Sequence, residues 1–173
     1  GKDTRNNLYW GAGYGVKSYF KFKTDDWTLL KTIPSNDENI LERVLFKHKS
    51  DDAYLLADAY DGEQIKHCIE DFLMASNGQY PFNIELEAAV LGFGGGSDLV
   101  AYVGHDGLME FEADVNYASP PSKQKDAIVL ACYTKEYFGK EIKLAGAKPL
   151  LWTTHLMAPE AYTLKAVIDA GYC

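Results

Sequence analysis

The sequence lacks any apolar run near the roughly 18 residues that a membrane-spanning helix needs. It is also poor in basic residues, with 17 Lys and Arg against 25 Asp and Glu and a formal net charge of −8. Binding of nucleic acid requires a basic surface that neutralises phosphates, and docking on anionic lipid requires the same. The composition therefore predicts no nucleic-acid partner and no membrane insertion.

Several short motifs of known mechanism are missing. There is no G-x-S-x-G, no C-x-x-C and no G-x-x-x-x-G-K-[ST], which excludes a serine-hydrolase elbow, thioredoxin-like redox chemistry, a zinc ribbon and a P-loop. The glycines at 11–15 and 94–96 do not have the G-x-G-x-x-G spacing of a dinucleotide site. We therefore predict that the protein uses no cofactor.

Only three cysteines occur, Cys68, Cys132 and Cys173. An odd number leaves at least one thiol free even if a Cys68–Cys173 bridge forms. Cys68 falls on a predicted apolar helical stripe, which is typical of a core residue rather than of a reactive thiol.

The chain begins Gly1-Lys2-Asp3 without an initiator Met. One interpretation is a mature exported protein, periplasmic or extracellular, whose signal peptide has been removed. The other interpretation is a trimmed expression product with a leftover tag glycine. We favour export as the expectation.

The length of 173 residues, with 47% hydrophobic and 24% charged residues, predicts a single domain spanning 1–173. Apolar runs alternate with helical patterns, which is typical of βαβ units. We expect strands over 8–16, 53–59, 99–103, 127–131 and 149–152, and irregular structure over 108–123. We expect helices over 36–47, from Ile65 to Asn77-Gly78, over 83–91, and from Pro159 onward. The predicted fold is a three-layer α/β/α sandwich with a mainly parallel sheet of about five or six strands.

Two reactive side chains follow successive predicted strands. His105 comes after strand 99–103, and Cys132 comes after strand 127–131. Ligands of open parallel sheets bind beyond the carboxyl ends of the strands, and neighbouring strands lie about 5 Å apart. A nearby imidazole favours the thiolate, which is the nucleophilic form of cysteine. The sequence thus predicts a Cys132–His105 dyad, with backbone amides at Gly107 and Cys132 positioned to hold an oxyanion.

This order of residues resembles the caspase-like superfamily of cysteine peptidases, which includes caspases, legumain, gingipain and clostripain. The family pattern is His-Gly after one strand and Ala-Cys after the next; this chain has His105-Asp106-Gly107, one residue longer, and Ala131-Cys132. The resemblance covers roughly residues 97–170. It implies Cys132 as nucleophile, His105 as general base and a peptide or protein substrate. It also implies that Trp152, Thr153 and Thr154 wall the substrate pocket.

Other polar residues carry weaker interpretations. Asp58 and Asp61, at the end of strand 53–59, are candidates to meet a basic substrate side chain. Alternatively, Asp61-Gly62 is a turn and Asp58 caps a backbone amide. The acidic residues after His105 form either a divalent-cation site or, as we favour, a solvated loop; they are Asp106, Glu110, Glu112 and Asp114.

The remaining histidines are less informative. His155 follows Thr154 at a strand end and is a spare candidate for the base. His48 and His67 are expected on helix surfaces and need no role.

The predicted function is a cysteine endopeptidase-like hydrolase that acts through an acyl-enzyme on Cys132. Two alternatives stay open. One is a non-catalytic, degenerate α/β binding module that keeps the fold without the chemistry. The other is a cysteine amidase or acyl transferase that acts on a non-peptide substrate with the same dyad.

Overall fold

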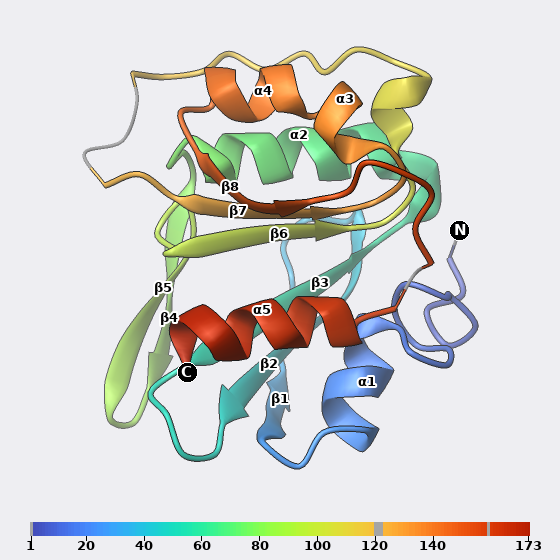
Figure 1. The fold of residues 1–173 in the computed structure, drawn as a ribbon. Helices are drawn as coiled ribbons and strands as arrows, with labels where there is room; N and C mark the ends of the chain where they lie inside the picture. The colour runs from blue at the N-terminus through green and yellow to red at the C-terminus, as the bar shows by residue number, and fades with distance from the viewer. Residues whose placement is uncertain (1, 120–122, 159) are drawn as a thin grey trace. The chain divides into compact units, whose positions relative to one another are not determined.

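The structure is a computed structural model that describes residues 2–119, 123–158 and 160–173 (Figure 1). The chain divides into two compact units, one of Gly1–Ile65 with Pro159–Cys173 and the other of Lys66–Ala158. The parts of our predictions that fall on residues 120–122 and on Pro159 lie outside the described residues. None of the described helices is both long enough and apolar enough to cross a membrane.

The first unit is built on an antiparallel sheet in the order β1-β2-β3. Its elements are α1 (Val16–Phe22), β1 (Trp27–Thr32), β2 (Ile40–His48), β3 (Tyr54–Tyr60), the short 3-10 helix η1 (Gly62–Gln64) and α5 (Tyr162–Tyr172). Phe20 of α1 lies at the centre of its core, with ring centroids 5.4 Å from Trp27 and 5.8 Å from Phe46. Burial of these three rings supplies much of the apolar area that holds the helix on the sheet.

Polar contacts fix α5 against the start of β1. The Lys165 ammonium binds Asp26 at 2.7 Å and also pairs with Asp169 one turn further along the helix. The indole N–H of Trp27 donates to Asp169 at 3.3 Å. The last turns of α5 are therefore held beside the end of the sheet where β1 begins and β2 ends, since Trp27 is paired with His48.

The second unit contains a parallel sheet in the order β6-β7-β8 and a separate hairpin. Its elements are α2 (Ile65–Ser76), β4 (Pro81–Leu86), β5 (Ala89–Gly94), β6 (Leu99–Val103), η2 (Gly107–Met109), β7 (Asp126–Leu130), α3 (Thr134–Tyr137), α4 (Gly139–Leu144) and β8 (Lys148–Trp152). The rings of Phe72, Tyr102 and Phe138 meet with centroids 5.6–6.2 Å apart. This aromatic cluster joins α2 and the α3–α4 segment to one face of the sheet.

The three strands around the predicted dyad are confirmed. The strand predicted over 99–103 coincides with β6, and those over 127–131 and 149–152 match β7 and β8 within one residue. The helix expected from Ile65 to Asn77-Gly78 is α2. Four consecutive residues of β7, 127–130, are buried, as a central parallel strand requires.

The predicted three-layer sandwich with a parallel sheet of five or six strands is wrong. The parallel sheet of the described residues has three strands, and the other two sheets are antiparallel, with three and two strands. The strand predicted over 53–59 exists as β3, but it pairs antiparallel with β2. The error comes from the segments before residue 97, where three elements were assigned to the wrong type.

The strand predicted over 8–16 is instead a series of turns followed by α1. The amides of Trp10, Gly11 and Ala12 all donate to the Asn7 carbonyl at 3.0–3.1 Å. The chain folds so tightly here that a Cβ on Gly11 would lie 2.2 Å from the carbonyl oxygen of Thr4. The glycines therefore serve close backbone packing, which an extended strand does not need.

The helix predicted over 36–47 is instead strand β2. The Ser35 hydroxyl accepts from the Asp37 amide at 3.1 Å, so the apparent capping box is a local turn. The next residues include the consecutive buried run Val44, Leu45 and Phe46. Consecutive burial places side chains on both faces of a strand, and the apolar spacing that suggested a helix also fits that pattern.

The helix predicted over 83–91 is the β4–β5 hairpin, which turns at 87–88. Phe82, Ile84 and Leu86 are half-buried and alternate with exposed residues along β4. This period of two is the strand signal, and it overrides the helical propensity of the Glu and Ala residues around it.

We predict that Phe46→Ala lowers the free energy of unfolding by about 3–5 kcal/mol, because the ring is fully buried against Phe20. Urea denaturation followed by tryptophan fluorescence measures the change. The control is Leu30→Ala on the same sheet, whose side chain is 43% exposed and should cost less than about 0.5 kcal/mol. Equal losses in the two variants contradict this core assignment.

Candidate active site

The two predicted dyad residues lie at the same edge of the parallel sheet. Strands β6 and β7 are hydrogen-bonded neighbours, as expected, and Val103 is paired with Leu130 at their carboxyl ends. His105 and Cys132 each lie two residues beyond that pair. The Gly104 amide continues the contact by donating to the Leu130 carbonyl at 3.2 Å.

Cys132 occupies the turn between β7 and α3. Its side chain is half-buried, and the thiol is 4.0 Å from the Met157 carbonyl. The next residue, Tyr133, adopts a left-handed conformation with φ 53°, which costs energy for a non-glycine residue. In the part of the chain that the structure describes, the Cys132 amide has no hydrogen-bond acceptor, so it is free to donate to a ligand.

A pair of threonines holds this turn in place. Thr134 is fully buried; its hydroxyl donates to the Val129 carbonyl at 3.1 Å and accepts from the Thr153 amide at 2.8 Å. The Thr153 hydroxyl in turn donates to the Ala131 carbonyl and accepts from the Thr134 amide at 3.2 Å. These bonds tie the end of β7 to the end of β8, and they fix the backbone on both sides of Cys132.

His105 is held through its backbone while its ring is half exposed. Its carbonyl accepts from the Tyr102 hydroxyl at 2.6 Å and from the Gly107 amide at 3.0 Å. One ring nitrogen, Nε2, lies 2.8 Å from Oε1 of Glu110. The carboxylate therefore engages one side of the imidazole and leaves Nδ1 for other chemistry.

Gly107 has a packing role that the sequence did not indicate. A Cβ at this position would lie 2.7 Å from the Phe111 ring and 3.0 Å from the Ile69 side chain. Because the Gly107 amide already donates to His105, it is not available to an oxyanion in this conformation. Of the two predicted oxyanion donors, only the Cys132 amide is open.

Asp106, directly after His105, is a buried carboxyl. One oxygen, Oδ1, caps η2 by accepting from the Leu108 amide at 3.1 Å, while the other, Oδ2, is buried with no hydrogen-bond partner. Burial raises the pKa of this carboxyl above its ordinary value. The sequence suggested a solvated acidic residue here, so the burial of Asp106 is a finding of the structure alone.

No hydrogen bond joins His105 to Cys132 among the described residues. The structure brings both residues to one sheet edge but leaves them in separate contacts, one with Glu110 and the other with Met157. Such separation does not disqualify a dyad, because catalytic hydrogen bonds are often long in the absence of substrate.

The other residues predicted near the dyad have mixed environments. Trp152 ends β8 and is half-buried, Thr153 is committed to the threonine pair, and Thr154 is exposed. His155 is also exposed; its carbonyl accepts from the Tyr133 amide at 3.0 Å, and its ring meets the Tyr133 ring edge-on. Trp152 and Thr154 therefore remain the better candidates for contact with a substrate.

Asp58 and Asp61 belong to the first unit, and both carboxylates have partners. Asp58 forms a bidentate pair with Arg43, with N···O distances of 2.7 and 2.6 Å, and this pair raises the pKa of the guanidinium. Asp61 caps η1 by accepting from the Glu63 amide at 3.1 Å, as the turn interpretation predicts. Neither carboxylate is free to select a basic substrate side chain.

The remaining sequence candidates add no residue to the carboxyl end of the parallel sheet. The acidic residues after His105 are not among the described groups whose ligand atoms lie close enough to share a metal ion. Among the described residues none of the three cysteines is in a disulfide, so the Cys68–Cys173 bridge is not formed. His48, expected on a helix surface, is instead a buried residue of β2.

We predict that Thr134→Val lowers the free energy of unfolding by about 1–3 kcal/mol, because it leaves buried partners of the hydroxyl unsatisfied. Urea denaturation gives the value. Thr154→Val is the matched control, since its side chain is exposed, and it should change stability by less than about 0.5 kcal/mol. A neutral Thr134→Val variant would refute the role of the threonine pair.

We predict that Asp106→Asn changes how stability depends on pH. A carboxyl whose pKa is raised by folding contributes stability below its unfolded pKa of about 3.9, and that contribution is lost as pH rises through the folded pKa. The free energy of unfolding of the variant, relative to the native protein, should therefore be higher at pH 7 than at pH 3. Urea melts at a series of pH values test this, and parallel curves for the two proteins would show that Asp106 is not the cause.

Comparisons with known proteins assign the chain to no family. No protein-family model, no curated protein and no solved structure matches the chain. The resemblance to caspase-like peptidases therefore stays a prediction from the residues themselves, and the function has to be inferred from the chemistry at the edge of the parallel sheet.

Proposed function

We propose that the protein is a cysteine-dependent hydrolase that cleaves peptide bonds through an acyl-enzyme on Cys132. The observation that carries the proposal is the register of β6 and β7, in which Val103 pairs with Leu130. His105 and Cys132 follow this pair at equal spacing, so an imidazole and a thiol leave the sheet from adjacent strands at one edge. This is the edge where parallel sheets bind their ligands.

In the proposed reaction, the His105 imidazole takes the proton of the Cys132 thiol. The thiolate attacks the carbonyl carbon of the peptide, forming a C–S bond and a tetrahedral oxyanion. The Cys132 amide, which has no internal acceptor, supports the proposal as a donor to that oxyanion. The imidazolium returns its proton to the leaving amine as the C–N bond breaks, and water then hydrolyses the thioester.

Glu110 supports the role of His105. A carboxylate that binds one nitrogen of an imidazole fixes the orientation of the ring and stabilises the imidazolium that forms when the other nitrogen takes a proton. The contact between Glu110 and Nε2 of His105, at 2.8 Å, leaves Nδ1 to accept the thiol proton. In this proposal Glu110 is a positioning residue.

One observation favours the alternative of a binding module without catalysis. The Gly107 amide is occupied by the His105 carbonyl, and the larger parallel sheet of caspase-like peptidases is absent from the described residues. A degenerate relative would keep the sheet edge and lose the reactivity of the thiol. The two functions therefore differ in the chemistry of Cys132.

We expect iodoacetamide to alkylate Cys132 near neutral pH about tenfold faster than Cys68 or Cys173, because in the proposed reaction His105 takes the thiol proton. Labelling against pH, located by peptide mapping and performed with a chelator present, measures all three thiols in one sample. His105→Ala should abolish the advantage of Cys132. Glu110→Gln should reduce it, while Glu112→Gln, the matched control in the same acidic segment, should not.

A peptide-library digest completes the test. Cleavage that is present in the native protein and lost in Cys132→Ala supports the hydrolase. Slow alkylation of Cys132 that does not respond to His105→Ala contradicts it and leaves the binding module. Fast, His105-dependent alkylation without peptide cleavage would instead indicate an amidase or acyl transferase with a non-peptide substrate.

A further inference from the structure

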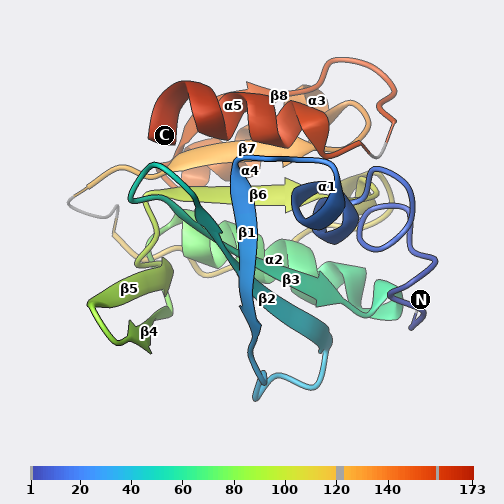
Figure 2. The ribbon, with the colours of Figure 1, turned by 90° about the horizontal axis from the view of Figure 1, so that it is seen from below.

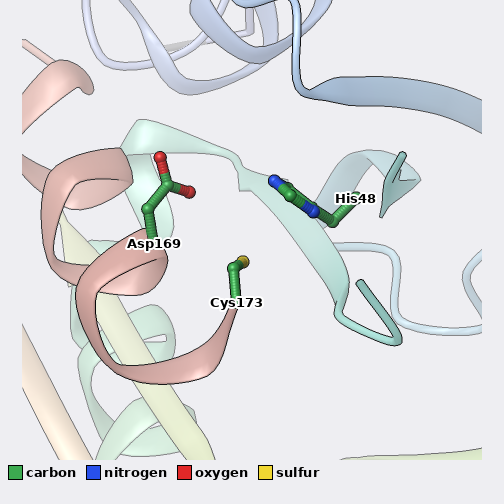
Figure 3. A group of neighbouring side chains, drawn as sticks. All are labelled: His48, Asp169 and Cys173. Atoms are coloured by element: carbon green, nitrogen blue, oxygen red, sulfur yellow. The ribbon is translucent and has the colours of Figure 1, made fainter. Parts of the chain in front are cut away.

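Three side chains of the kinds that bind metal ions meet in the first unit, apart from the proposed active site. His48 ends β2, Asp169 lies in the last turns of α5, and Cys173 follows that helix (Figure 3). Each offers one ligand atom, and these atoms all lie within 4.8 Å of one another. Neither the sequence motifs nor the predicted dyad pointed to this cluster.

His48 is buried and has its ring orientation fixed. Its Nδ1 atom lies 2.8 Å from a carboxylate oxygen of Asp51 and 3.2 Å from the Asp51 amide. Its ring packs edge-on against Trp27 at 5.1 Å. The ring nitrogen farther from the backbone points toward Asp169 and Cys173 (Figure 3). Metal-binding histidines commonly have this arrangement, in which a carboxylate holds one nitrogen and the other is free for the ion.

Both carboxylate oxygens of Asp169 have a hydrogen-bond partner, but one of these two bonds is weak. Lys165 binds its Oδ2 atom, and the Trp27 indole N–H is 3.3 Å from Oδ1, a long and weak hydrogen bond. Oδ1 therefore keeps the capacity to accept a stronger ligand. Cys173 is exposed, so its side chain has room to adjust and an ion has access from solvent.

We propose that His48, Asp169 and Cys173 bind a divalent transition-metal ion, with zinc as the preferred ion. Thiolate sulfur and imidazole nitrogen with one carboxylate oxygen form a donor set that suits Zn²⁺ rather than Mg²⁺ or Ca²⁺. Tetrahedral zinc places its ligand atoms about 3.3–3.6 Å apart. The ligand atoms of the cluster lie within 4.8 Å of one another, so the site closes slightly when the ion binds.

The proposed ion fastens the last turn of α5 to the end of β2. Three protein ligands leave a fourth position for water or another small ligand, as in open zinc sites. The Asp51 carboxylate, which lies 2.8 Å from Nδ1 of His48 without being a ligand, adds negative charge beside the ion. It accepts a hydrogen bond from Nδ1 in the tautomer whose other nitrogen ligates the ion, and that tautomer replaces the one in which Nδ1 accepts from the Asp51 amide.

Cobalt titration of the tag-free full chain tests the site directly. With Co²⁺ as the probe, we expect one equivalent to bind and to produce a sulfur-to-cobalt charge-transfer band in the near ultraviolet. Cys173→Ala should abolish the band, whereas Cys68→Ala and Cys132→Ala, the matched controls for the other two thiols, should keep it. A band that is absent, or that survives Cys173→Ala, overturns the proposal.

Zinc affinity and thermal melts provide the second measurement. Zinc at 100 times its dissociation constant should raise the melting temperature of the native protein by about 5–10 °C. Asp169→Asn and His48→Gln should each weaken zinc binding more than about tenfold in calorimetric titrations. If His48→Gln fails to fold, Asp169→Asn alone decides, since its side chain keeps the same size. Unchanged affinity in Asp169→Asn overturns the assignment of this ligand set.

Discussion

Strand β7 is buried along four consecutive residues, and this constraint determines where His105 and Cys132 lie in the second unit. A strand with apolar side chains on both faces has to be central, so β6 and β8 lie on either side of it as parallel neighbours. The carboxyl ends of parallel strands lie at the same end of the sheet. The pairing of Val103 with Leu130 then places His105 and Cys132 two residues beyond the ends of adjacent strands, and Thr153, which follows β8, holds the turn at Thr134.

The sequence was sufficient to predict the three strands of the parallel sheet. The apolar runs at 99–103, 127–131 and 149–152 are short and follow Asp98, Asp126 and Lys148, and a short apolar run bounded by polar residues is typical of a strand. The segment 36–47 failed for a physical reason. Its apolar residues form one adjacent pair, 40–41, and one run of three, 44–46. This spacing fits one face of a helix and also both faces of a buried strand, and pairing with β1 and β3 decides between them.

The position of His105 and Cys132 beyond adjacent strands was predictable from the sequence, whereas the contacts that hold the surrounding backbone were not. Cysteine and histidine at strand ends are visible in the sequence, whereas the Thr134–Thr153 contact joins residues 19 positions apart and depends on β8 lying beside β7. The same holds for Asp58, which appeared free until the β2–β3 register placed it opposite Arg43. Asp106 could not be recognised as buried because an acidic neighbourhood is normally solvated.

The electrostatic setting of Cys173 separates its chemistry from that proposed for Cys132. Burial and the negative charges of Asp169 and Asp51 raise the pKa of the Cys173 thiol, which disfavours the free thiolate that a nucleophile needs. The same carboxylates attract a cation, and a bound divalent ion replaces the thiol proton instead of leaving an exposed thiolate. A cysteine beside acidic groups is thus poorly placed to attack a carbonyl carbon, whereas its sulfur lies within 4.8 Å of the ligand atoms of His48 and Asp169. The Cys132 thiol instead contacts the Met157 carbonyl, and the Cys132 amide has no internal acceptor among the described residues, so it can donate to the oxyanion of the proposed acyl transfer.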